Sequence, residues 1–183
     1  MATAPENSRT AEKILVLKAQ TGDVKAFEVL YRAYLPSLVG FARRLSGDDH
    51  MAEDAVQDAW ITISKTINRL KEPEKFRAWV FKTVRWRLID LARRKGKGLV
   101  SLDDVQDGLV IPHDRASIEA RDLRTLIKAL PSAEQDAVYL FYLEGFSVKE
   151  ISDVLNVPIG TVKSRLNRAR TNLREAYIYD ENK

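Results

Sequence analysis

The stretch 143–174 constrains the fold most, because it predicts two short helices joined by a tight turn. Ser147 is a favoured N-cap residue, and Glu150 three residues later completes a capping box. The run Asn156-Val157-Pro158 ends this first helix, since proline disfavours the helical conformation of the residue before it. The second helix then begins near Ile159 or Gly160.

The second helix has two unlike sides. Its core side consists of apolar residues spaced three and four apart, Val162, Leu166, Ala169 and Leu173. Its other side bears hydroxyls, amides and cations: Thr161, Ser164, Asn167, Arg168 and Thr171, flanked by Lys163, Arg165, Arg170 and Arg174. No carboxylate occurs between Asp153 and Glu175. This surface suits a polyanion with base edges to read, although a solvated basic face is the simpler alternative. The cap, the proline turn and the one-sided charge together favour a helix-turn-helix.

Composition limits the function classes without choosing one. The net charge of +4 and the pI near 9.3 permit a nucleic-acid partner but do not require one. The absence of cysteine excludes disulfides and thiolate metal sites. The polar N-terminus and the short run 14–17 predict no signal peptide or membrane anchor, so we expect a cytoplasmic protein without membrane insertion.

The remaining chain also has helical periodicity and predicts an all-α fold. Gly22-Asp23 separates two helices, and Pro36 is expected to open a further one. Later helices are expected over 50–70, 76–94, 118–130 and 133–142. Four aspartates in 99–114, together with Gly108 and Pro112, predict an acidic flexible linker. The expected organisation is a tail (1–10), a helical domain (11–95), the linker (96–117), a second helical domain (118–178) and a tail (179–183).

The helix expected over 50–70 carries an exposed stripe at helical spacing, which we call the acidic stripe: Asp54, Gln57, Asp58 and Ile61. Ordinary solvated acid is one interpretation, and a docking surface for a basic partner is another. A metal site that includes His50 is disfavoured. Helical di-metal sites repeat a Glu-x-x-His pair on facing helices, and the only other histidine is His113.

The helix expected over 76–94 combines a core face with an aromatic, basic face. The core face contains Phe76, Val80, Val84 and Leu91, and the other face contains Trp79, Lys82, Trp86 and Arg93. Alternating indoles and cations suit unstacked bases and phosphates, because every base has a π-face. Burial in the core is the alternative for both tryptophans, and it is favoured for Trp79.

Several of these motifs resemble a known family. Leu130-Pro131, the 142–145 run and 160–166 with Arg168-Ala169-Arg170 resemble region four of bacterial sigma-70-family factors, in particular the small extracytoplasmic-function (ECF) group. The 49–60 segment resembles the region-two segment that binds the clamp helices of core RNA polymerase. The 76–94 helix resembles the segment that recognises and melts the minus-ten element, with Arg85-Trp86 where the family usually has Arg-Asn.

The resemblance implies an alternative sigma factor rather than an enzyme. It assigns core-polymerase binding to Asp54, Gln57, Asp58 and Ile61, and minus-ten recognition and melting to Lys82, Arg85, Trp86 and Arg93. Minus-thirty-five recognition falls to Thr161, Lys163, Ser164, Arg165, Asn167 and Arg168. The implied partners are core RNA polymerase, promoter DNA and an anti-sigma factor, and the linker is expected to run toward the polymerase active-site cleft.

Two other function classes remain as alternatives. The first is a free-standing helix-turn-helix regulator, and the second is a helical metalloenzyme built on the acidic cluster. The sequence contains no nucleophile–base pair, phosphate loop or metal-ligand set. We therefore expect no catalytic residue, metal or cofactor.

Overall fold

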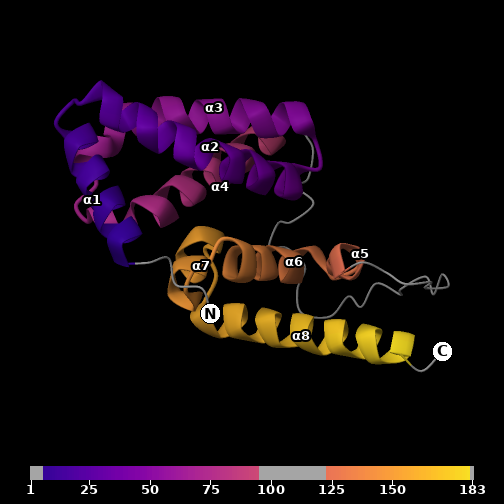
Figure 1. Cartoon of the computed structure of the whole chain (residues 1–183). Coiled ribbons are helices and arrows are strands. Elements are labelled where there is room, and N and C mark those ends of the chain that lie inside the picture. The colour runs from indigo at the N-terminus through magenta and orange to yellow at the C-terminus, as the bar shows by residue number, and fades with distance from the viewer. Residues whose placement is uncertain (1–5, 95–122, 182–183) are drawn as a thin grey trace.

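The computed structural model describes residues 6–94 and 123–181, and the regular elements in those ranges are all helical (Figure 1). The first half contains α1 (Glu6–Gln20), α2 (Val24–Ser46), α3 (Asp49–Thr66) and α4 (Phe76–Arg94), with short 3-10 turns at Ile67–Arg69 and Pro73–Lys75. The second half contains α5 (Leu123–Lys128), α6 (Ser132–Val138), a π-helical turn (Tyr139–Leu143), α7 (Val148–Leu155) and α8 (Ile159–Glu181). The all-α prediction is confirmed.

Short polar residues set the boundaries of the first helices. The Asp23 carboxylate accepts a hydrogen bond from the Ala26 N–H at 3.0 Å and caps α2. Gly47 ends α2 with a left-handed φ of 62°, a conformation that glycine adopts at little cost. Asp48 then caps α3 by accepting from the Met51 N–H at 3.0 Å. The predicted breaks before α2 and α3 are confirmed.

The prediction that Pro36 opens a new helix is wrong. Pro36 lies inside α2, which continues through it from Val24 to Ser46. An internal proline costs a helix about 3 kcal/mol or more. Tyr34 and Leu38, on either side of it, are both buried in the core. Burial of this face on both sides of the proline offsets the lost hydrogen bond, so the helix is kept.

Other boundaries also differ from the expected ones. α1 begins at Glu6, inside the expected 1–10 tail. α8 continues to Glu181, inside the expected 179–183 tail. The helix expected over 133–142 becomes α6 followed by the π-helical turn. The linker 96–117 lies outside the described residues, as does the start of the helix expected over 118–130.

The core of the first half lies between α2, α3 and α4. On α3, the apolar residues that recur at helical spacing are all buried: Ala55, Val56, Ala59, Trp60 and Ile63. On α4, Phe76, Val80 and Val84 are fully buried, whereas Leu91 is half-buried. The periodicity therefore located the core face of both helices.

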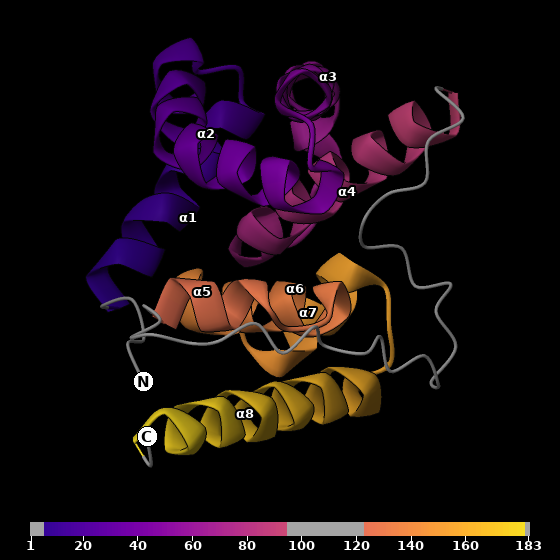
Figure 2. The same ribbon diagram turned by 90° about the vertical axis from the view of Figure 1, so that its right-hand side faces the viewer.

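In the second half, α8 forms the outermost layer, on the side away from α1–α4 (Figures 1 and 2). Its apolar stripe packs inward, with Val162, Leu166 and Ala169 buried. α7 lies between α8 and the first half and contacts α4. As a result, one hydrophobic cluster runs through both halves. None of the helices in the two described ranges is long and apolar enough to cross a membrane.

Candidate nucleic-acid and docking interfaces

The helix-turn-helix is built by local hydrogen bonds at the ends of α7. The Ser147 hydroxyl accepts from the Glu150 N–H at 3.3 Å, and the Glu150 carboxylate accepts from the Ser147 N–H at 2.8 Å. This is the predicted capping box. Asn156 ends α7 in the left-handed conformation with φ 59°. α8 begins at Ile159, where the sequence predicted it.

The outer side of α8 presents the predicted donors and acceptors to solvent. Lys163, Ser164, Asn167 and Arg168 are exposed, whereas Thr161 and Arg165 are half-buried. The Ser164 hydroxyl donates to the Thr161 carbonyl at 2.9 Å, so it faces outward chiefly as an acceptor. A guanidinium, an amide and an ammonium on one open helix face can reach base edges and phosphates.

A buried carboxylate that the sequence reasoning missed lies behind this surface. Glu134 on α6 is 6% exposed. The Asn172 amide donates to it at 3.0 Å, and the Arg168 Nε lies 3.8 Å from its other oxygen. Burial raises the pKa of Glu134, while Asn172 and Arg168 act in the opposite direction. Arg168 therefore lies at the edge of the outer face, close to α6 as well as to solvent.

The acidic stripe is exposed on α3 as predicted. Asp54, Gln57 and Asp58 are exposed, and Ile61 is 46% exposed. The neighbouring acids behave differently, since Arg43 pairs with Asp49 at 3.1 Å and Glu53 at 3.0 Å. In the described part of the chain, the stripe's own carboxylates have no ion-pair or hydrogen-bond partner. They are thus available to a basic partner.

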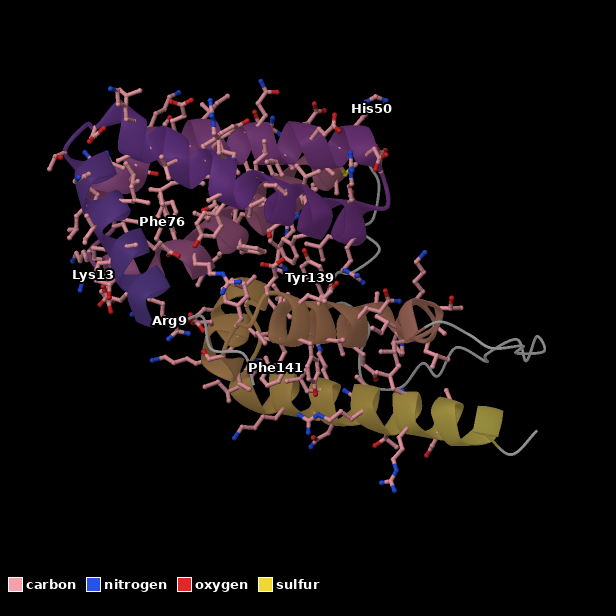
Figure 3. All side chains as sticks on the ribbon, viewed as in Figure 1. Arg9, Lys13, His50, Phe76, Tyr139 and Phe141 are labelled. Atoms are coloured by element: carbon pink, nitrogen blue, oxygen red, sulfur yellow. The ribbon has the colours of Figure 1, made fainter. Side chains whose placement is uncertain are left out.

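Two cations, Lys65 and Arg87, lie at one end of the acidic stripe. Asp58 and Ile61 line an open pocket together with Thr62, Lys65, Thr66 and Arg87. The Arg87 guanidinium donates to the Thr62 hydroxyl at 2.6 Å and ties α4 to α3. At this end of the stripe, the apolar side chain of Ile61 therefore lies near a carboxylate, that of Asp58, and near two cations, Lys65 and Arg87. His50 lies exposed at the start of α3 (Figure 3).

The aromatic, basic face of α4 is only partly open. Trp86 is 64% exposed, Arg93 is exposed and Lys82 is half-buried. Trp79 is half-buried against the core, as favoured from the sequence, but core burial of Trp86 is contradicted.

Arg85 differs from its predicted neighbours, because it is only 7% exposed and cannot contact DNA in this conformation. It lies one helical turn after Phe81, whose ring is 5.0 Å from the Phe146 ring of the second half. Arg85 shares its side of α4 with Phe81, Leu88 and Ala92, which are all buried, and this position explains why its side chain is not exposed.

Comparison with known proteins places both halves in one family. Residues 30–98 match Sigma-70 region 2, and residues 120–173 match Sigma-70 region 4. The ECF RNA polymerase sigma factor EcfG of Rhodopseudomonas palustris is 31% identical over 80% of this chain and 82% of its own length. The RNA polymerase sigma-H factor of Pseudomonas aeruginosa is 30% identical over 88% of this chain and 91% of its own.

Solved structures agree with these relatives. The sigma factor RpoE of Bartonella quintana, in complex with the anti-sigma factor NepR, is 28% identical. It superposes with a TM-score of 0.62 over 86% of this chain and 99% of that one. CnrH in complex with the cytosolic domain of CnrY has the same TM-score at 22% identity and supports the fold alone. The chain thus belongs to the extracytoplasmic-function group of sigma-70-family RNA polymerase sigma factors.

Proposed function

We propose that this chain is an alternative sigma factor that binds core RNA polymerase, directs it to two-part promoters and helps to open the DNA. The observation that carries this proposal is the order of the two family regions, each with its own exposed surface. Region 2 presents the exposed acidic stripe on α3, and region 4 presents cations and amides on α8. The corresponding functional units are residues 11–95 and 118–178.

In this proposal, α8 reads the minus-thirty-five element in duplex DNA. Arg168 and Asn167 supply the guanidinium and amide groups that pair with base edges in the major groove. Lys163 supplies a point charge for phosphate. Thr161, Ser164 and Arg165 complete the surface.

α4 is proposed to act on the minus-ten element once its strands separate. The exposed indole of Trp86 offers a stacking surface for an unpaired base. Lys82 and Arg93 occupy the same side of the helix and suit the adjacent phosphates. Stacking tolerates every base, so we expect good melting with loose base preference where the family usually has asparagine. Arg85 is buried and would join this surface only after a rearrangement that exposes it.

The acidic stripe on α3 is proposed to bind core RNA polymerase, with Ile61 as its apolar edge. Since a basic surface would meet Asp54, Gln57 and Asp58, an anti-sigma factor can act by covering the same region. The protein would work in the cytoplasm, where polymerase is found, and would catalyse no covalent reaction and need no cofactor.

The stripe is tested by charge reversal of Asp54, with Glu28→Lys as the matched control. Both acids are exposed, but Glu28 lies on α2 and pairs with Arg32 at 2.6 Å. We expect Asp54→Lys to weaken capture by immobilised core polymerase at least tenfold, with an unchanged circular dichroism melt. Glu28→Lys should bind core polymerase like the unaltered protein. Equal capture of all three proteins would contradict core binding by the stripe.

A gel shift separates the sigma factor from a free-standing regulator. On duplex promoter DNA, a sigma factor should give a specific complex only when core polymerase is present. Tight, specific binding of the isolated chain to duplex DNA, with no effect of core polymerase, would favour the regulator.

A further inference from the structure

We propose that the open pocket at one end of the acidic stripe, between α3 and α4, binds a carboxylate side chain of core RNA polymerase through Lys65 and Arg87. The partner surface would then be basic opposite Asp54 and Asp58 and acidic opposite the pocket. The proposal rests on the proposed function, because the stripe brings core polymerase to the pocket. Figures 1 and 2 show α3 on the side of the first half away from α6–α8, where a partner can reach it.

Lys65 continues the line of side chains that forms the acidic stripe. Along this line, the spacing i, i+4, i+7 and i+11 puts four side chains on one side of α3: Asp54, Asp58, Ile61 and Lys65. All four are exposed. At 1.5 Å per residue, Lys65 lies about 10 Å beyond Asp58 along the helix axis. The exposed line therefore changes from negative to positive within two helical turns.

Arg87 brings a second cation to the same place from another helix. It lines the pocket together with Lys65 and Thr66, and its guanidinium donates to the Thr62 hydroxyl at 2.6 Å. The Thr62 hydroxyl in turn donates to the Asp58 carbonyl at 2.9 Å. These two hydrogen bonds hold the guanidinium at the pocket. Since a guanidinium has five N–H donors, the bond to Thr62 leaves others for a carboxylate.

The charges around the pocket are not neutralised by one another. Within residues 6–94 and 123–181, neither Lys65 nor Arg87 forms an ion pair, although the Asp58 carboxylate lines the same pocket. A nearby acid of α4, Asp90, pairs with Arg94 at 2.8 Å instead. Lys65 lies in the last turn of α3, where the helix dipole favours a cation. That position accounts for Lys65 alone and does not explain a second cation contributed by α4.

The size and lining of the pocket favour a partner's side chain over a free small molecule. The volume is about 320 Å³, at the lower end of the range of about 300–1,000 Å³ for small-molecule sites, which are mostly apolar and enclose their ligand. This pocket is open, and Ile61 is the one hydrophobic residue among those that line it. The Thr62 and Thr66 hydroxyls both donate to backbone carbonyls. The donors left for an anion are therefore those of Lys65 and Arg87.

A protein carboxylate suits this position better than a DNA phosphate. Asp58 and Ile61 belong both to the stripe and to the pocket, so a partner that covers the stripe also reaches the pocket. A DNA strand carries a charge at every phosphate and would meet Asp54 and Asp58 along the same line. A single carboxylate of a protein surface brings one negative charge and leaves these acids free to pair with cations of that surface.

Capture by immobilised core polymerase in the absence of DNA tests this charge pattern through the sign of one effect. If the partner surface is basic throughout, Lys65→Glu adds an attractive charge and should strengthen capture. If a carboxylate enters the pocket, Lys65→Glu should weaken capture by about fivefold or more, and Lys65→Ala should weaken it by about two- to fivefold. Lys18→Glu, at an exposed cation of α1, is the matched control and should leave capture unchanged.

Two further variants separate the pocket from folding and from net charge. Arg87→Gln removes the charge and retains an amide donor, and it should weaken capture by about two- to fivefold. The exchange of Asp58→Lys with Lys65→Asp keeps the net charge and reverses the order of charges along α3. It should be captured less well than Asp58→Lys alone, whereas a partner that is basic throughout would capture it better. Circular dichroism melts show whether each variant remains folded.

The outcomes separate the pocket from the proposed function. Stronger or unchanged capture of Lys65→Glu, with weaker capture of Asp54→Lys, would overturn the pocket and leave core binding by the stripe intact. Unchanged capture with slower promoter opening by Lys65→Glu and Arg87→Gln would assign both cations to a phosphate and would also overturn it. Normal capture of a folded Lys65→Ala would overturn it even if the other variants unfold. Failure of core polymerase to capture the unaltered protein would overturn the proposed function and the pocket together.

Discussion

α4 and α8 are both basic helices assigned to DNA, yet they hold their functional side chains in different ways. α8 is the outer layer of region 4, so one side packs inward and Lys163, Asn167 and Arg168 remain open. α4 lies between the core of region 2 and α7. On it, Arg85 is buried, whereas Trp86, the next residue, is 64% exposed. A helix in the outer layer displays what its sequence pattern predicts, whereas a helix between layers displays only what its neighbours leave uncovered.

The largest expected effect contrasts two aromatic residues on α4. Phe81→Ala removes a fully buried ring and should lower the free energy of unfolding by about 3–5 kcal/mol. Trp86→Ala removes an exposed ring and should change it by no more than about 0.5 kcal/mol. Trp86→Ala should nevertheless slow open-complex formation without weakening core binding. Denaturant unfolding and promoter-opening kinetics on both variants check this, and a large stability loss with no selective opening defect in Trp86→Ala would end the stacking role.

The next effect concerns base reading by α8. If Arg168 pairs with a base, Arg168→Ala should cost about 1–3 kcal/mol of binding and relax preference at one upstream position. If it contacts phosphate, all sequences should weaken alike and the salt slope should fall by about one. Affinity measured against a set of upstream sequences at several salt concentrations distinguishes the two. An unchanged affinity and salt slope would remove Arg168 from the interface.

Glu134→Gln tests how the buried carboxylate behind α8 affects Arg168 and the stability of region 4. The amide still accepts a hydrogen bond from Asn172 but no longer offers a charge to Arg168. Because burial raises the pKa of Glu134, its charged form is disfavoured in the fold. The contribution of this group to stability is full at acidic pH and falls as pH rises through the folded pKa. Glu134→Gln should thus keep or slightly raise stability at pH 7 and should not lower it, as measured by thermal unfolding.

A smaller effect is expected at the N-cap of α7. Ser147→Ala removes the acceptor for the Glu150 N–H and should destabilise the protein by about 0.5–2 kcal/mol. Ser64→Ala on the exposed side of α3 is a suitable control, since Ser64 caps no helix. Equal thermal midpoints for the two variants would mean that the cap contributes nothing to α7.

The smallest expected effect is the contribution of the Tyr139 hydroxyl to the pH dependence of the unfolding free energy. It becomes measurable only in alkaline solution. Burial, reinforced by Glu144, raises the pKa of Tyr139 above its ordinary value of 10.0. The unfolded chain therefore ionises first, so this contribution is full below pH 10 and is lost as pH rises further. Burial and Glu12 raise the pKa of Tyr34 in the same direction. Tyr139→Phe should flatten part of the alkaline decline in unfolding free energy, and an identical decline would contradict the role of this hydroxyl.

Local signals in the sequence were sufficient for the helix-turn-helix. Ser147, Glu150 and Pro158 act on residues within one turn of themselves, so their effect can be predicted from spacing alone. The core faces of α3 and α4 were also predictable, because burial repeats with the helical period. The same reasoning failed at Pro36, where packing on both sides outweighs the propensity of one residue.

The missed features all join residues that are far apart in the chain. Glu134 meets Arg168, and Glu144 meets Arg77. Periodicity shows which residues of a helix are buried or exposed, but it does not show which other helix will cover them. A carboxylate in α6 and a cation in α8 are therefore paired only once the three-dimensional arrangement is known.

Run-off transcription with purified core RNA polymerase on genomic fragments tests the sigma-factor assignment most directly. The unaltered chain should yield discrete transcripts that need both core polymerase and the protein. Asp54→Lys should abolish them, whereas Glu28→Lys should leave them intact. Specific duplex binding by the isolated chain, with no transcript from any fragment in the presence of core polymerase, would contradict the assignment.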